Sequence, residues 1–461
     1  MNYTPERESL RKHIVPEWYN DAKLGIFIHW GLFSVPAFAV TGMSIIESSE
    51  KRSVEEYFAN NPYAEWYLNS LRIPGSPTQE YHTKTYGNDF PYDNFASIFN
   101  EHIKKWDPKE WAKLFKNIGA RYVVLTTKHC DGFLLWPSKY PNPNKKNYYA
   151  SRDIVGELSE AVKEEGMKMG FYYSSAWDWS FNHFPIKDTR SFNKHYVQTC
   201  EYAKYVTNHW YELMDNYSPL ILWSDMGYPA GNNPYEIFAD FYNKNPEGVV
   251  NDRWNQFLPE QNKFNITRHK DFTTPEYQVF KEVRKRKWET CRGIGNSFGY
   301  NQFESEEDYM SAEELIFLLI DIVSKNGNLL LNVGPTADGI IPEIQEKRLI
   351  KLGDWLDVNG EAIFGTRPWE RAEGNTTEDI PIRFTRKEEN IYAILMGKPK
   401  SDEIIIVDLA LENVSKINLL GIEGELVWKE ANNNLVIKLP DKILDSPAIS
   451  FRIVLKLNRT D

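Results

Sequence analysis

Polar side chains that could carry out acid–base or nucleophilic chemistry stand at the ends of several short apolar runs. Asp225 ends LILWSD, His29 follows LGIFI and His129 ends YVVLTTKH. Tyr172 lies in MGFYYSS, and Arg253 follows VVND. Any one of them could be an ordinary polar residue at a strand end, but the strands of a parallel barrel all open on one face. The sequence therefore predicts that these five side chains converge on one site.

Two carboxylates are needed to hydrolyse a glycosidic bond, one at the anomeric carbon and one to protonate the departing oxygen. Asp225 is the first candidate nucleophile, because its charge after an apolar run is expected at a mouth and not in a core. A helix cap or a salt bridge is the alternative. We prefer Glu276 as acid/base, because FTTPEYQ is a Pro-containing loop from which a carboxylate is free to approach the leaving group. Glu289 in KWETC is the second choice, since a carboxylate on a strand can merely hold the barrel together.

Other chemistries find weaker support. Zinc bound by His29, His129, Cys130 and Asp225 is conceivable, but His-x-x-x-His and Cys-x-x-Cys spacings are absent there. Hydrogen bonding to sugar hydroxyls explains neutral histidines beside Trp and Tyr more simply. No phosphate-binding glycine loop follows a strand. We therefore predict neither a metal nor an organic cofactor.

The elements that must position these residues alternate between strand and helix over the first 370 residues. The apolar runs indicate strands buried on both faces. DPKEWAKLFKNIGA, from Asp107, indicates a helix with an N-cap Asp followed by Pro, and IVGELSEAVKEEGMK, from Ile154, indicates another. This order predicts the α/β class, with a (β/α)8-like (TIM-type) barrel over residues 1–370. Alternating strands in 371–461, such as IYAILMG and FRIVLKL, predict a C-terminal β-sandwich domain.

The overall composition limits the partners. A net charge of −11 would repel phosphate backbones, so nucleic acid is not expected. No apolar run is long enough to predict a membrane span. The first residues lack the apolar stretch of a secretory signal, so we expect a cytoplasmic chain, or a secreted or periplasmic one if a signal was removed. Three widely spaced cysteines fit a reducing compartment. A homo-oligomer is left open.

Longer strings resemble glycoside hydrolase family 29, the α-L-fucosidases. They include WYNDAKLGIFIHWGLFSVPAF, AEWY, EWAKLFKNIGARYVVLTTKHCDGFLLW, RDIVGEL, LWSD, NDRW, SFGYN and NLLLNVGPTADG. They follow the order of the family from about residue 17 to residue 369. Several long motifs in one order make the resemblance highly specific. It implies a retaining α-L-fucosidase that removes fucose from oligosaccharides or glycoconjugates by double displacement.

The resemblance also implies roles for individual residues. The Asp of LWSD, Asp225, corresponds to the nucleophile. The implied fucose-binding residues are His29, Glu65, Trp66, His129, Tyr172, Trp223, Arg253 and Phe298. Phe298 would face the C5 methyl group, which gains from an apolar wall. Similar sequences place the acid/base after NDRW, which matches Glu276, while Glu289 stays open.

Two departures from the family pattern affect these expectations. KHCDGF replaces KHHDGF, so Cys130 stands where a second pocket histidine is usual, and a thiol is a weak hydrogen-bond partner. The stretch GMSIIESSEKRSVEEYFANNPYAEWY is longer than usual, and we expect it at the rim, where it would shape the aglycone site. The rival hypotheses are a barrel glycosidase for a galactoside or arabinoside, and a fucose-binding protein that has lost catalysis.

Overall fold

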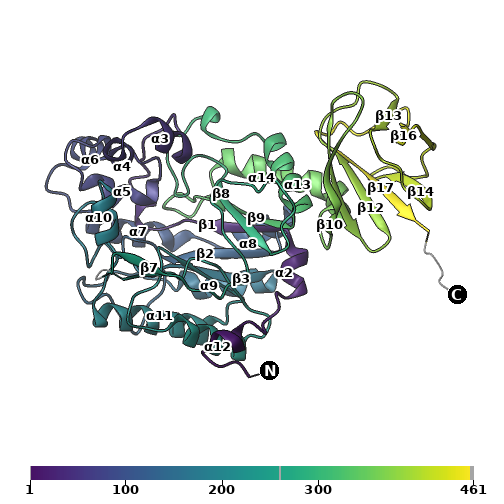
Figure 1. Cartoon of the computed structure of the whole chain (residues 1–461). Helices are drawn as coiled ribbons and strands as arrows, with labels where there is room; N and C mark the ends of the chain where they lie inside the picture. Colours follow the sequence, from purple (N-terminus) through teal and green to yellow (C-terminus); the bar gives the residue numbers. More distant parts are fainter. Residues whose placement is uncertain (1, 259–260, 457–461) are drawn as a thin grey trace.

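Seven parallel strands form the frame of the larger part of the chain (Figure 1). The computed structural model describes residues 2–258 and 261–456. The strands lie side by side in the order β5 (Val249–Val250), β4 (Ile221–Asp225), β3 (Lys168–Ser174), β2 (Tyr122–Lys128), β1 (Leu24–Ile28), β9 (Gly327–Val333) and β8 (Trp288–Gly293). Every residue of β1, β2, β4 and β9 is buried, which explains their continuous apolar character.

An irregular segment fills the gap between the edge strands β5 and β8. The Asp271 N–H donates to Val250 O at 3.0 Å on one side. On the other side, Thr273 and Glu276 form parallel bridges with Trp288 and Cys291. The segment thus occupies the eighth position of the barrel, and the expected (β/α)8-like fold is confirmed. The segment around Glu276 lies outside the named strands, as expected of a loop, but its backbone is held to β8 by these isolated bridges.

Helices connect successive strands and pack on the outside of the barrel (Figure 1). The principal ones are α8 (Pro108–Asn117), α9 (Ile154–Glu164), α11 (Cys200–Tyr217), α12 (Pro234–Lys244), α13 (Ala312–Ser324) and α14 (Glu343–Asn359). The predicted start of α8 is confirmed: the Asp107 carboxylate accepts from the Lys109 N–H at 2.9 Å, and Pro108 occupies the first helical position. Of the described helices, none is long and apolar enough to cross a membrane.

Short helices fill the remaining connections. Two precede β1, α1 (Arg7–Leu10) and α2 (Glu17–Ala22). The connection between β1 and β2 contains α3 (Ile45–Lys51), α4 (Val54–Ala59), the 3-10 turn η2 (Ala64–Trp66), α5 (Tyr67–Leu71), α6 (Pro77–Tyr86) and α7 (Phe95–His102). α10 (Thr189–Lys194) follows β3, and a small hairpin of β6 (Gln256–Leu258) and β7 (Lys263–Asn265) follows β5.

The C-terminal part is built from two antiparallel sheets, as predicted. One contains β10 (Arg367–Asn375), β11 (Pro381–Lys387), β12 (Asn390–Leu395), β17 (Ile449–Leu455) and β14 (Val414–Leu419), in that order. The other contains β13 (Glu403–Ile406), β16 (Asn434–Lys438) and β15 (Trp428–Ala431). A hydrophobic core separate from that of the barrel lies between them.

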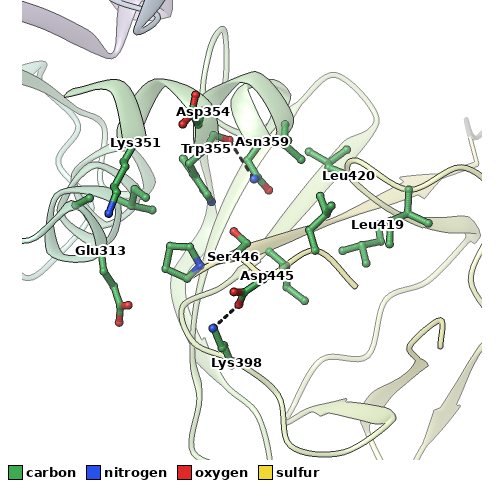
Figure 2. A pocket seen from close by; sticks show the side chains of 17 residues that line it. Glu313, Lys351, Asp354, Trp355, Asn359, Lys398, Leu419, Leu420, Asp445 and Ser446 are labelled. Atoms are coloured by element: carbon green, nitrogen blue, oxygen red, sulfur yellow. Dashed lines mark hydrogen bonds and ion pairs between the residues drawn. The ribbon is translucent and has the colours of Figure 1, made fainter. Parts of the chain in front are cut away.

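Helices α13 and α14 join this sandwich to the barrel. The Trp355 indole donates to Ala448 O at 2.9 Å, and Arg383 pairs with Asp321 at 2.5 Å. A cavity of about 490 Å³ lies between the two helices and the sandwich, with the ion pair of Lys398 and Asp445 at its edge (Figure 2). The two parts therefore meet through specific polar contacts around a partly open junction.

Gly25 in β1 offers a test of how tightly the barrel interior is packed. A Cβ at this position would lie 2.3 Å from the Tyr122 ring. We expect Gly25→Ala to lower the free energy of unfolding by about 1–3 kcal/mol, because the ring has to move. Urea denaturation of this variant beside Ile26→Val, a mild change on the same strand, measures the effect. A midpoint unchanged from the parent would contradict the packing.

Candidate active site

A cavity, here called the barrel cavity, lies at the carboxyl ends of the strands. Its lining residues are Phe27, His29, Tyr63, Glu65, Trp66, His129, Tyr172, Trp223, Asp225, Met226, Arg253, Glu276, Cys291 and Phe298. All the site residues expected from the sequence are among them, except the second-choice acid Glu289. Residues spread over the chain from β1 to the segment after β8 thus meet in one place.

Asp225 ends β4, and both of its carboxylate oxygens accept hydrogen bonds. The Tyr172 hydroxyl donates to Oδ2 at 2.9 Å, and the Arg253 guanidinium donates to Oδ1 at 3.0 Å. The residue is buried but borders the cavity. These donors hold a charged carboxylate in a fixed orientation with little solvent around it.

Glu276 is held in the same way from the opposite side of the guanidinium. Arg253 Nη2 donates to one of its oxygens at 3.2 Å, and the Tyr63 hydroxyl donates to the other at 2.8 Å. Burial alone would lower the pKa of Arg253, but the charges of Asp225 and Glu276 raise this pKa well above its ordinary value. One permanent cation therefore joins the two carboxylates.

Glu289 occupies a different environment, inside the barrel. Its side chain is fully buried and accepts from the Tyr19 hydroxyl at 2.8 Å, the Tyr122 hydroxyl at 2.5 Å and the Trp223 indole at 3.0 Å. Burial raises the pKa of this carboxyl. The Trp223 ring in turn lies 4.7 Å from the Arg253 guanidinium. Glu289 thus fixes the indole that supports Arg253, and it does not line the cavity.

Two histidines supply neutral polar groups. His29 Nδ1 lies 2.7 Å from Asn332 Oδ1, and the same amide donates to Phe298 O at 2.6 Å. The amide oxygen therefore faces His29, so Nδ1 carries the proton and Nε2 is left as an acceptor. Burial lowers the pKa of His29 to about 4 and that of His129 well below its ordinary value. His129 Nδ1 has no hydrogen-bond partner within the described residues.

The long connection after β1 supplies one wall of the cavity. Its helices α3 and α4 each begin with a capping box, at Ser44 and Ser53. The turn η2 then brings Glu65 and Trp66 to the cavity, and Glu65 accepts from the Gly299 N–H at 2.8 Å. Glu65 and Trp66, at the end of this segment, are buried.

Cys130 does not line the barrel cavity. It is fully buried, its Sγ lies 3.2 Å from Ser174 Oγ, and burial raises the pKa of the thiol. Cys130 therefore contacts Ser174 and offers no group to the cavity, in keeping with the expectation that a thiol at this position is a weak partner for a sugar hydroxyl. Across the described part of the chain, no group of three or more His, Cys, Asp or Glu side chains is arranged to hold a metal ion.

Four lining residues were not expected from the sequence: Phe27, Tyr63, Met226 and Cys291. Phe27 could have been found by alternation, since it lies two residues before His29 in the same run. Cys291 alternates with Glu289, which does not line the cavity, so alternation alone does not identify it. Tyr63 stands two residues before Glu65 in a segment with no strand pattern. Met226 directly follows Asp225 and has a backbone φ of 56°. No residue pattern in the sequence predicts this turn.

Known α-L-fucosidases resemble the chain along its whole length. Residues 1–361 match the family described as Alpha-L-fucosidase, and residues 374–458 match the Alpha-L-fucosidase C-terminal domain. The α-L-fucosidase of Dictyostelium discoideum is 34% identical, and the alignment covers 92% of this chain and 87% of that relative. The tissue α-L-fucosidase of Homo sapiens is 33% identical, and the alignment covers 99% of this chain and 91% of that relative. The Thermotoga maritima α-fucosidase in complex with fucose is 44% identical, with a TM-score of 0.87 over 98% of this chain and 100% of that one.

Glu65 gives the cavity a testable pH dependence. Burial raises its pKa from 4.5 to about 8. Between these values the folded chain keeps a proton that the unfolded chain has released, so folding loses stability as the pH rises. We expect the unfolding free energy of the parent, relative to Glu65→Gln, to fall by up to about 1.4 kcal/mol per pH unit across this window and to level off above it. Denaturation from pH 5 to 9 measures this, with the exposed Glu55→Gln as control. A difference between parent and Glu65→Gln that does not change with pH would contradict it.

Proposed function

The chain belongs to the α-L-fucosidase family, and we propose that it releases terminal α-linked L-fucose with retention of configuration. It is thus a glycoside hydrolase with α-L-fucosidase activity. The observation that carries the retaining mechanism is the single Arg253 guanidinium that contacts both Asp225 and Glu276. A guanidinium that spans two carboxylates keeps them close together, and retaining enzymes need a separation of roughly 5 to 5.5 Å.

In the first step, Asp225 attacks the anomeric carbon while Glu276 donates a proton to the departing oxygen. The carbon–oxygen bond to the leaving group breaks as the bond to Asp225 forms. Arg253 and Tyr172, which both donate to Asp225, hold its oxygens toward the sugar. In the second step, Glu276 removes a proton from water, and the resulting attack frees Asp225.

The remaining lining residues are proposed to bind the fucose ring. His29 Nε2 and His129 offer uncharged nitrogens to sugar hydroxyls, because burial keeps both rings neutral. A protonated Glu65 can donate to a further hydroxyl. Phe298, whose ring lies 4.8 Å from that of His29, offers the apolar wall for the C5 methyl group. Trp66, Tyr172 and Trp223 complete the enclosure.

The substrate is a fucosylated oligosaccharide or glycoconjugate, and the complex of the Thermotoga maritima relative with fucose supports this choice. The three cysteines are free, which supports a reducing compartment such as the cytoplasm. We also propose that residues 1–370 form the catalytic domain and that residues 371–461 form the sandwich domain.

Replacement of each carboxylate, with azide as an added nucleophile, tests the roles. We expect Asp225→Ala to reduce turnover of an aryl α-L-fucoside at least about a thousand-fold. Azide can then enter on the vacated face and give β-L-fucosyl azide. Glu276→Gln should lose about 10²–10⁴-fold on fucosides with sugar leaving groups, and its azide product should be the α anomer. Product analysis by NMR distinguishes the two anomers.

Other outcomes would redirect the assignment. A Glu276→Gln variant with full activity on sugar leaving groups would remove Glu276 from the acid role. A parent that binds fucose without turnover would indicate a sugar-binding protein, and faster turnover of a β-D-galactoside would indicate another substrate.

A further inference from the structure

The barrel cavity has one accessible side. Of its lining residues, Met226, Arg253 and Glu276 are partly exposed, whereas the others are buried. The Glu276 side chain is 33% exposed and the Arg253 side chain 22%. A leaving group attached to the sugar at the anomeric carbon must therefore pass this side, where Glu276 can reach its oxygen.

A second cavity of about 280 Å³, here called the outer cavity, adjoins the first on this side. The two share Asp225, Met226 and Arg253 as lining residues. The outer cavity continues from there over the turn after β4 to the hairpin of β6 and β7. Gly227 forms part of this turn with a φ of 82°, and a Cβ there would lie 2.5 Å from Asn255 O. Glycine thus keeps the turn close to the floor of the outer cavity.

Aromatic rings form one side of the outer cavity. Phe264 on β7 is 41% exposed, although Phe is usually buried. Its ring meets that of Tyr196 edge-on, with centroids 5.5 Å apart. Tyr196 also stacks on Phe257 at 5.1 Å, so the rings are held in place from behind. An exposed ring on a supported aromatic cluster offers a flat apolar surface for the face of a sugar.

Polar groups also line the outer cavity. Asn255 Oδ1 accepts from the Thr267 N–H at 2.9 Å, which turns the amide nitrogen away with no partner among the described residues. The Tyr196 hydroxyl likewise has no hydrogen-bond partner within the described chain. Asp252 uses Oδ1 for Thr274, while its Oδ2 is 3.8 Å from Lys270. Two donors and a carboxylate therefore line the outer cavity together with Phe264.

We propose that the outer cavity binds the sugar to which fucose is attached, with Phe264 against one face of its ring and Asn255, Tyr196 and Asp252 at its hydroxyls. This inference rests on the proposed fucosidase function and identifies the leaving group as a pyranose rather than an aryl group or a peptide. An aryl group would leave the two donors unpaired, which costs binding energy. The chain then selects its substrates by the sugar next to fucose.

Two substrates that differ in their leaving group separate this subsite from catalysis. The fluoride of α-L-fucosyl fluoride is too small to reach the outer cavity, whereas the second sugar of a fucosyl disaccharide fills it. We expect Phe264→Ala to lower the ratio of kcat/KM for the disaccharide to kcat/KM for the fluoride about ten-fold. Tyr196→Phe, which keeps the ring and removes the hydroxyl, should lower the same ratio by a smaller factor. Ile266→Ala is the matched control, since Ile266 is 57% exposed next to the hairpin and does not line the cavity.

Sugar transfer provides a second readout. With α-L-fucosyl fluoride as donor and a free hexose as acceptor, the acceptor hydroxyl attacks the fucosyl–Asp225 intermediate while Glu276 takes its proton. The ratio of transfer product to free fucose should fall in Phe264→Ala and stay at the parent value in Ile266→Ala. Ratios that are unchanged in Phe264→Ala in both assays would overturn the subsite. A parent that does not hydrolyse α-L-fucosyl fluoride would instead overturn the proposed function.

Discussion

The Arg253 guanidinium is the contact on which the geometry of the site depends. Its two terminal nitrogens contact two different carboxylates, while its Nε donates to Thr274 Oγ1 at 2.9 Å. A double displacement needs one carboxylate at the anomeric carbon and the other at the departing oxygen. The guanidinium that contacts both groups therefore limits the distance between them.

The position of Arg253 depends in turn on groups beneath it. Trp223 lies under the guanidinium, and its indole N–H is fixed by the buried Glu289. Tyr19 and Tyr122 complete the coordination of Glu289, and the Tyr122 ring fits over Gly25 on the neighbouring strand. A buried carboxylate without such donors would be costly, so the three donors and Glu289 stabilise one another. The packing of Tyr122 in β2 against Gly25 in β1 therefore helps to fix Glu289 and, through Trp223, the position of Arg253.

The residue pattern alone predicted this site where strands carry it, whereas Glu65, Trp66 and Phe298 were expected only from the resemblance to the family. Asp225 and His29 could be placed because each follows a continuous apolar run, and parallel strands end on one face. The segment around Glu276 has no such run, so its pairing with β8 was missed. The choice between Glu276 and Glu289 could not be made from alternation. Glu289 and Cys291 both point into the barrel, but only Cys291, which is nearer the carboxyl end of β8, lines the cavity. How far a strand residue lies from the cavity depends on the stagger between neighbouring strands.

The connection between β1 and β2 shows why enclosure was equally hard to foresee. The ends of barrel strands are open to water, and a pocket there must be closed by segments from outside the barrel. Here the connection contacts the region after β8 through the Ala64 N–H to Ser297 Oγ at 2.9 Å and the Gly299 N–H to Glu65. The Tyr63 hydroxyl adds a third contact, a hydrogen bond to the Glu276 carboxylate. Because one segment both closes the sugar pocket and orients the proposed acid, a change in how it docks alters sugar binding and proton transfer together.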